Sequence, residues 1–384
     1  MNLPKGWIEQ KFSDVAKVVT GNTPKTFDVD NYGGDLPFIT PSELKSSEAI
    51  INTPITISKK GETQARIIPE NAVLVCCIGS LGKVGITGRK SAFNQQINAL
   101  IFDSEQVYYR YGYHYCRTLK PILEHFAPST TVPIVNKGKF QEFKIPIPPI
   151  ASQRTIANIL DKADEIIRKR KEAIALTEQL QKSIFLDMFG DPVINPKGWE
   201  VNKVIDYCDC IVPGRDKPKS FTGSIPWITT ADLKFLDKTY FSNLNMKLSE
   251  NEIKEVNAKI IPKNSVLLTC VGDLGVTSIA GCDMVVNQQL HSFQCKNINN
   301  YFLMYALPYQ KIFMYKRATQ TTVPYMNKNT CNSIPIIYPP RKLQEKFGIL
   351  IAEINNKKGL YLKALQESEN LFNSLLQKAF KGEL

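Results

Sequence analysis

The sequence is poor in the residues that most often hold metals or carry acid–base chemistry. It has only three histidines, His114, His125 and His291, in 384 residues, and its nine cysteines include no CxxC pair. Neither a zinc site nor a histidine-based active site is indicated. An odd number of cysteines without a repeated spacing predicts reduced thiols and a cytoplasmic protein. No apolar run approaches the roughly 20 residues that span a bilayer, and MNLPKGWIEQ lacks the pattern of a signal peptide.

Acidic residues are also in short supply. The chain has 36 Asp and Glu against 48 Lys and Arg, which gives a formal net charge of +12. Such an excess is typical of proteins that bind polyanions, because each neutralised phosphate releases counterions. A hydrophobic content of 43% is ordinary for a globular protein with a sizeable core.

The chain consists of two copies of one pattern. PKGW at 4–7 returns at 196–199, RIIPENAVL from Arg66 returns as KIIPKNSVL from Lys259, and TTVP at 130–133 returns at 321–324. The offset between copies stays within 189 to 193 residues along the chain. Small insertions in loops over one shared scaffold produce such a drift.

Each copy ends in a predicted long helix. Pro148-Pro149 opens a run of about 40 residues without Gly or Pro, and Gly190 closes it. Apolar residues recur there at steps of three and four, as at Ile156, Ile159 and Ala163, which is coiled-coil spacing. Pro339-Pro340 opens the second copy at an ungapped offset of 191. We expect the two helices to pack antiparallel, which would give the chain a pseudo-two-fold symmetry.

The remainder of each copy predicts a globular domain of mixed strands and helix. Strands are expected at 14–20, 37–40, 72–78, 84–87 and 97–102, and one helix at 105–120 with a counterpart at 300–316. The fold class is α/β (α+β). We assign residues 1–147 and 192–338 to two similar domains, and residues 148–191 and 339–384 to the two helices.

Several short motifs resemble the specificity (S) subunits of type I restriction–modification enzymes. The marks are Pro-Lys-Gly-Trp near each domain start, Thr-Thr-Val-Pro before each helix, Pro-Pro followed by Gln153 or Gln344, and the ending LQKAFKGEL. The resemblance implies two target recognition domains that bind double-stranded DNA, one half-site each, and two helices that act as a spacer. It also implies docking of two adenine methyltransferase subunits, which carry S-adenosylmethionine, together with restriction subunits. The specificity subunit itself would hold no cofactor.

Candidate DNA contacts are amides, hydroxyls and cations in matching loops of the two copies. In the first copy they are Asn22, Thr23, Lys25, Ser42, Ser80, Lys83, Gln95, Gln96, Thr130, Thr131 and Lys137. In the second they are Arg215, Lys217, Lys219, Thr230, Asp273, Gln288, Gln289, Thr321, Thr322 and Lys328. A structural role competes with base contact for the repeated Asn-Gln-Gln triplets, and solvated loop surface competes for the others. The repeated hydroxyl and Lys clusters are interpreted as phosphate contacts.

Catalytic motifs are absent or incomplete. Gly79-Ser80-Leu81-Gly82-Lys83 lacks the spacing of a phosphate loop. Asp35 with Glu43 and Lys45 resembles a nuclease D…ExK set, but the second copy has no acid at Ser224. No GxGxxG and no Asn-Pro-Pro-aromatic methylase motif is present. We therefore expect no catalytic residue and no metal. A stand-alone DNA-binding regulator and a protein scaffold remain alternatives to the specificity subunit.

Overall fold

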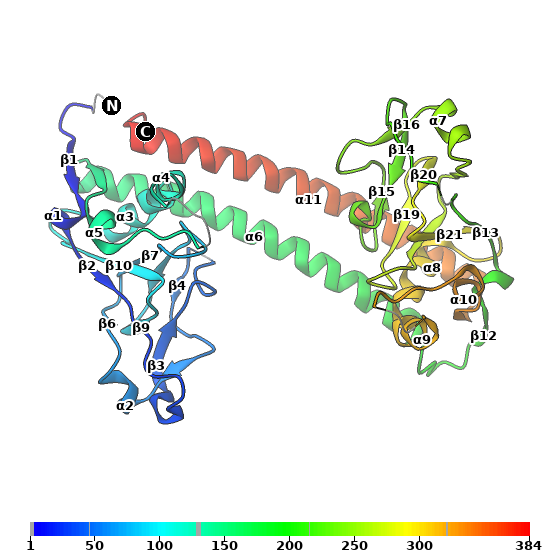
Figure 1. Cartoon of the computed structure of the whole chain (residues 1–384), viewed down its shortest axis with the longest axis horizontal. Helices are drawn as coiled ribbons and strands as arrows, with labels where there is room; N and C mark the ends of the chain where they lie inside the picture. The colour runs from blue at the N-terminus through cyan, green and yellow to red at the C-terminus, as the bar shows by residue number, and fades with distance from the viewer. Residues whose placement is uncertain (1–3, 46, 128–131, 215, 320–321) are drawn as a thin grey trace. The chain divides into compact units, whose positions relative to one another are not determined.

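The computed structural model describes residues 4–45, 47–127, 132–214, 216–319 and 322–384. It contains two compact units, each combining one globular copy with half of each long helix. Unit 1 comprises Met1–Lys171 and Lys363–Leu384, and unit 2 comprises Glu172–Leu362. The helices are α6 (Ile150–Phe189) and α11 (Arg341–Lys381), both unbroken in Figure 1. This confirms the two predicted helices; the predicted domain boundaries stay a prediction.

Unit 1 is built on three small sheets. The largest has the strand order β2 (Ala16–Thr20), β10 (Ile97–Phe102), β7 (Val73–Cys76), β8 (Val84–Thr87) and β4 (Ala49–Ile50). The second has the order β5 (Thr56–Ile57), β3 (Tyr32–Ile39), β9 (Ser91–Phe93) and β6 (Ile67–Ile68). The third pairs β1 (Ile8–Lys11) with β11 (Lys144–Ile147). Only β4–β8 and β3–β9 are parallel among these pairs.

Unit 2 repeats this topology strand for strand. Its five-stranded sheet has the order β13 (Cys208–Ile211), β21 (Leu290–Cys295), β18 (Val266–Thr269), β19 (Thr277–Ala280) and β15 (Lys238–Thr239). Its four-stranded sheet has the order β16 (Lys247–Leu248), β14 (Ile225–Ile228), β20 (Met284–Val286) and β17 (Ile260–Ile261). Its last sheet pairs β12 (Glu200–Lys203) with β22 (Pro335–Tyr338). The duplication in sequence is therefore a duplication of fold.

Two predicted elements differ from the structure for local reasons. The strand expected at 14–20 begins at Ala16, because Phe12–Val15 form the short helix α1. The helix expected at 105–120 is shorter, α3 (Tyr109–Cys116), and α4 (Lys120–Phe126) starts a new helix with a proline in its first turn. In unit 2 a 3-10 turn with Pro308 separates α8 (Asn300–Ala306) from α9 (Lys311–Arg317).

The long helices run antiparallel within each unit. In unit 2, Lys358 pairs with Glu178 at 2.8 Å, and Gln181 Nε2 donates to Asn355 Oδ1 at 2.6 Å. In unit 1, Arg170 donates to the carbonyl of Ala364, while Phe380 near the end of α11 shares a core with Ile156 near the start of α6. Higher numbers on one helix therefore face lower numbers on the other, as expected.

A buried glutamine joins each long helix to its globular part in the same way. Gln153 Oε1 accepts the backbone N–H of Tyr108 at 2.8 Å, and its Nε2 donates to the Pro148 carbonyl at 2.9 Å. Gln344 makes the equivalent bonds to Asn299 N at 2.9 Å and Pro339 O at 2.8 Å. Both side chains are fully buried. The Gln after each Pro-Pro pair therefore ties the start of the long helix to the start of α3 or α8, the helix that follows the last strand of the five-stranded sheet.

A second joint in unit 1 consists of charged groups. Arg110 donates to both oxygens of Asp161 at 2.8 and 2.5 Å, and His114 Nε2 lies 2.7 Å from Asp161 Oδ1. Arg117 pairs with Asp164 at 2.9 Å and lies over the Phe372 ring. Burial alone would raise the pKa of Asp161, but the bonds from His114 and Arg110 outweigh it and hold the pKa below its usual value.

Aromatic rings pack between α6 and the globular part of unit 2. Phe185 on α6 lies 5.8 Å from Phe302, 5.5 Å from Tyr309 and 5.5 Å from Phe347, measured between ring centroids. Phe189 lies 4.7 Å from Phe302. The counterpart of Asp161, at offset 191, is Ala352, which cannot form an ion pair. Among the described residues, no helix is long and apolar enough to cross a membrane.

Candidate nucleic-acid interface

The loop after β2 leaves the sheet against the Asn94–Gln96 turn. Gly21 N–H donates to Ile97 O at 3.1 Å, and a Cβ on Gly21 would lie 2.1 Å from Asn94 O, so only glycine fits there. Two residues later, Thr23 Oγ1 donates to Gln95 Oε1 at 2.6 Å. Two predicted contacts, Thr23 and Gln95, are therefore brought together, with Gln95 exposed.

The repeated Asn-Gln-Gln turns hold themselves together. Asn94 Nδ2 donates to Gln96 Oε1 at 2.9 Å, and Gln96 N–H donates to Asn94 Oδ1 at 3.2 Å. Asn287 and Gln289 form the same two bonds at 3.0 and 3.2 Å. Their shared bonds support the structural interpretation for the first and third members of each triplet. The middle residues, Gln95 and Gln288, are exposed and carry amides suited to bidentate pairing with adenine.

The turn at 79–83 lies beside this surface. Gln96 Nε2 donates to Ile78 O at 3.4 Å, and Gly79 N–H donates to Pro133 O at 3.0 Å. A cleft of about 670 Å³ opens there, lined among others by Ser80, Lys83, Lys120 and Pro133. The cleft places two of the predicted contacts beside a further cation, Lys120, that sequence reasoning missed. Thr130 and Thr131, which precede Pro133, lie outside the described residues.

Other predicted contacts of unit 1 are engaged with the protein itself. Asn22 Nδ2 donates to Gln64 O at 2.6 Å, and Asn22 Oδ1 accepts from Arg66 N at 2.6 Å, so the amide braces two loops. Ser42 Oγ donates to Glu43 Oε1 at 2.7 Å. Lys25 and Lys137 are exposed, the latter at the start of α5 (Lys137–Gln141).

Unit 2 has a cleft where its matching loops meet. It measures about 540 Å³, and its lining includes Lys217, Thr230, Gln288 and Gln289. Trp227 and Phe221 also line it, and their ring centroids lie 5.3 Å apart. The structure therefore brings together four of the predicted contacts in one concave site with an apolar wall. Arg215 lies outside the described residues.

A buried carboxylate fixes the loop that borders this cleft. Glu252 on α7 (Glu250–Glu255) accepts from Ser220 Oγ at 2.5 Å, from Thr222 N at 3.1 Å and from Ser249 N at 2.7 Å. The bond from Ser220 and the bonds that follow it lower the pKa of Glu252 to about 2. The carboxylate is therefore charged at neutral pH and ties the loop to the helix.

The remaining predictions in unit 2 divide between paired and exposed residues. Asp273 forms an ion pair with Lys311 at 2.6 Å, which reduces its availability to DNA. Lys219, Thr322 and Lys328 are exposed. Thr321 lies outside the described residues. Asn327, beside Lys328, accepts from Thr330 N at 2.9 Å and so caps α10 (Lys328–Asn332). In the parts of the chain that the structure describes, no group of three or more His, Cys, Asp and Glu could hold a metal.

The two units therefore present different chemistry from equivalent loops. Unit 1 offers a hydroxyl–amide pair and a cleft with cations, whereas unit 2 offers an amide, hydroxyl and lysine cleft with an aromatic wall. Amides and hydroxyls pair with base edges, and lysines neutralise phosphates. Neither set contains an activated nucleophile beside a base, so the arrangement suits binding and not bond cleavage.

The model of the type I restriction modification DNA specificity domain matches this chain twice, at residues 4–176 and 196–368. The MjaIX type I restriction enzyme specificity subunit of Methanocaldococcus jannaschii is 25% identical over 428 residues, covering 100% of this chain and 94% of the relative. The EcoBI specificity subunit of Escherichia coli is 22% identical, covering 100% and 87%. The crystal structure of the S subunit from M. genitalium aligns with a TM-score of 0.65 at 15% identity, covering 99% and 96%.

Proposed function

This chain belongs to the type I restriction–modification DNA specificity family, and we propose from that premise that each unit reads one half of a split DNA target. Specificity subunits of such systems are not the catalytic subunits, and this chain is a specificity subunit with two target recognition domains. The observation that carries the proposal is the pair of equivalent loop surfaces with unequal chemistry. One fold repeated with different loops suits two different half-sequences in one asymmetric target.

Affinity for DNA would come from the basic excess and specificity from the loop surfaces. A net charge of +12 supplies phosphate neutralisation that does not depend on sequence. In unit 1 the amide of Gln95, positioned by Thr23, is the proposed base reader. In unit 2 Gln288 takes that place, with Lys217 and Thr230 beside it.

The long helices are the proposed docking surface for methyltransferase subunits. Large apolar side chains are exposed on both helices: Ile159, Ile166 and Leu371 in unit 1, and Leu176, Leu180, Ile349 and Leu360 in unit 2. Apolar surface on a helix that already packs against its neighbour indicates a further protein partner. One solved relative comes from work on complex assembly of a type I system. The partners would supply S-adenosylmethionine and methylate adenine, and restriction subunits would join them.

The test is a base-resolution map of adenine methylation in cells that co-express this chain with the methyltransferase encoded beside it. Cells that express the methyltransferase alone are the control. We expect a split, asymmetric motif that appears only when the chain is present. A stable complex that adds no new motif would contradict the proposal and favour a regulator or scaffold. DNA binding that weakens steeply with salt would then separate the regulator from the scaffold.

A further inference from the structure

Two large apolar side chains stand exposed on one loop of unit 1. Phe27 is 81% exposed and Val29 is 77% exposed. Single exposed apolar residues are ordinary. A largely exposed aromatic ring held on a fixed loop is different, because contact of its apolar surface with water costs free energy that binding to a partner would recover. The loop that carries both residues, 24–31, follows Thr23 directly and so continues the candidate interface.

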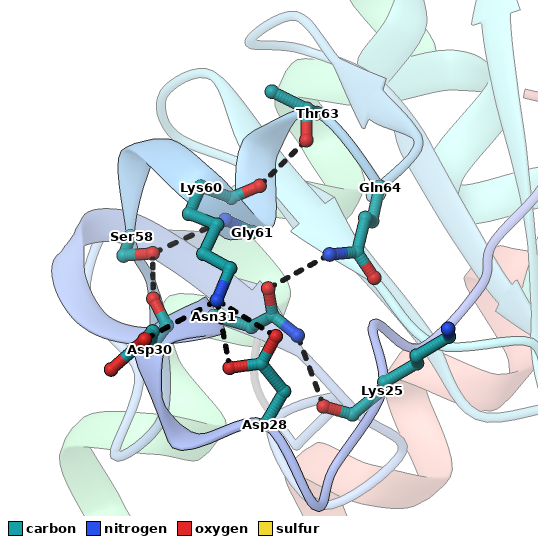
Figure 2. A network of polar contacts seen from close by, with 9 residues as sticks. All are labelled: Lys25, Asp28, Asp30, Asn31, Ser58, Lys60, Gly61, Thr63 and Gln64. Carbon is teal, nitrogen blue, oxygen red and sulfur yellow. Dashed lines mark hydrogen bonds and ion pairs between the residues drawn. The ribbon is translucent and has the colours of Figure 1, made fainter.

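Polar contacts hold this loop in one conformation (Figure 2). Asn31 is fully buried, donates from Nδ2 to Lys25 O at 3.1 Å and accepts from Gln64 Nε2 at 2.9 Å. Ser58 Oγ donates to Asp30 O at 2.5 Å, and Asn31 N–H donates to Asp28 O at 3.1 Å. The bonds engage Lys25, Asp28, Asp30 and Asn31, and the exposed Phe27 and Val29 lie between these residues in the sequence.

The charged groups near the loop are one lysine shared by two carboxylates and a second, exposed lysine. Lys60 Nζ lies 2.9 Å from Asp28 Oδ2 and 3.2 Å from Asp30 Oδ2, and Figure 2 shows both carboxylates turned toward it. The bond from Lys60 holds the pKa of Asp28 below its usual value, so the carboxylate stays charged beside the lysine. Lys25 is exposed, with Nζ 5.9 Å from the Phe27 ring centroid.

We propose that Phe27 and Val29 form an apolar wedge that packs into duplex DNA at a base step of the half-site read by unit 1. The occupant is DNA because the loop is continuous with the Thr23–Gln95 surface and carries an exposed lysine. Apolar side chains that enter a base step unstack it and bend the duplex. This proposal rests on the proposed function and adds to it a readout of DNA shape. The wedge should favour a pyrimidine–purine step, because such steps are the most easily unstacked.

The described part of the matching loop of unit 2 has an exposed valine, Val212, but no exposed aromatic ring. Its aromatic residue, Phe221, packs on Trp227 at 5.3 Å between ring centroids and lines the cleft. The distortion caused by the Phe27 loop should therefore occur only in the half of the target that unit 1 reads. That asymmetry separates the wedge from the effect of the methyltransferase partners, which act on both halves.

The experiment uses the complete complex with its methyltransferase subunits on duplexes that contain the mapped target. Thymine oxidation by permanganate is scanned along both halves, away from the methylated adenines, and affinity is measured at fixed salt. The variants are Phe27→Ser, Phe27→Trp and, as matched control, Ile194→Ser, because Ile194 is 77% exposed but lies between α6 and β12. Complex assembly is checked for each variant.

We expect one reactive step in one half-site with the unmodified complex, with Phe27→Trp and with Ile194→Ser. Phe27→Ser should abolish that reactivity and weaken target binding by about 5- to 150-fold, the range expected for the loss of one aromatic side chain stacked on a base. Unchanged reactivity and affinity with Phe27→Ser would overturn the wedge while leaving the split target intact. Loss of methyltransferase binding with Phe27→Ser would also overturn it, because the loop would then contact protein. Absence of any split target in the unmodified complex would refute the proposed function instead.

Discussion

Units 1 and 2 share one topology but hold their parts together with different chemistry. In unit 1 the globular part joins α6 through Asp161, which Arg110 and His114 contact at 2.5 to 2.8 Å. In unit 2 packed rings around Phe185 join the globular part to α6, at positions that do not correspond to Asp161. The buried Gln bonds are identical in both. The fold therefore requires the glutamine, whereas the rest of the joint needs only to be complementary.

The loops after β2 and β13 show the same difference in their supports. Each is braced from a short helix, α2 (Lys59–Glu62) or α7, that begins after a serine cap, Ser58 or Ser249. At the third helical position, unit 1 has Gly61, where a Cβ would lie 2.1 Å from Asn31 O. Unit 2 has Glu252 there, and its carboxylate binds the loop instead. The loop of unit 1 is therefore held by the side-chain amide of Asn31, and the loop of unit 2 by the carboxylate of Glu252. Equivalent scaffolds thus carry loops that are supported differently.

The largest effect is expected from removing the aromatic joint of unit 2. Phe185→Ala deletes a fully buried ring and should lower the free energy of unfolding by about 3–5 kcal/mol. Its counterpart in unit 1, at offset 191, is Leu376, which is only half-buried, so Leu376→Ala should cost clearly less. Denaturant unfolding of both variants measures the difference. Equal costs would mean that the two joints are not organised differently.

A smaller effect is expected from removing the charged joint of unit 1. Asp161→Ala leaves Arg110 and His114 without their shared carboxylate, and a broken, largely buried pair costs roughly 2–4 kcal/mol. Glu165→Ala on the same helix is the control, since Glu165 pairs with Lys169 at the exposed surface, where ion pairs contribute little. Calorimetric melting of both variants provides the measurement. A stability for Asp161→Ala as high as that of the control would show that the joint is dispensable.

The smallest effect is local and depends on pH. The pKa of Glu252 is about 2 in the folded protein against a usual 4.5. Its contribution to stability is therefore complete above pH 4.5 and is lost as pH falls toward 2. Glu252→Gln removes the charge at every pH and should speed hydrogen exchange of the Thr222 amide at pH 7. Glu62→Gln in α2, whose carboxylate pairs with exposed Lys59, should leave that amide unchanged. Equal protection in Glu252→Gln and the unmodified protein would refute the brace.

Much of the architecture could be predicted because it depends on the spacing of residues that are close together in the sequence. The ungapped repeat and the apolar spacing after Pro148 located both long helices, and apolar runs located strands such as β7 and β8. Strand order could not be predicted, because it depends on pairings between distant residues such as Ala99 and Val19. The charged joint could not be predicted for the same reason, because Arg110 and Asp161 are 51 residues apart.

The candidate site was only partly predictable. A residue type shows that a side chain can bind a base, but not whether the protein already occupies it. Asn22 and Gln96 have the right amides, yet both are bonded to neighbouring groups of the protein. Phe27 was not singled out, because an apolar residue in a polar loop carries no signal until its exposure and the buried Asn31 beneath it are known.

The most direct test of the account exchanges one reading domain. Residues 1–147 are replaced by the matching segment of another specificity subunit that retains partners for Asp161, and adenine methylation is mapped with the original methyltransferase. Assembly of the complex is verified first. We expect one half of the split motif to change and the other half to stay as it was. A motif that changes in both halves, or in neither, would contradict independent reading by the two units.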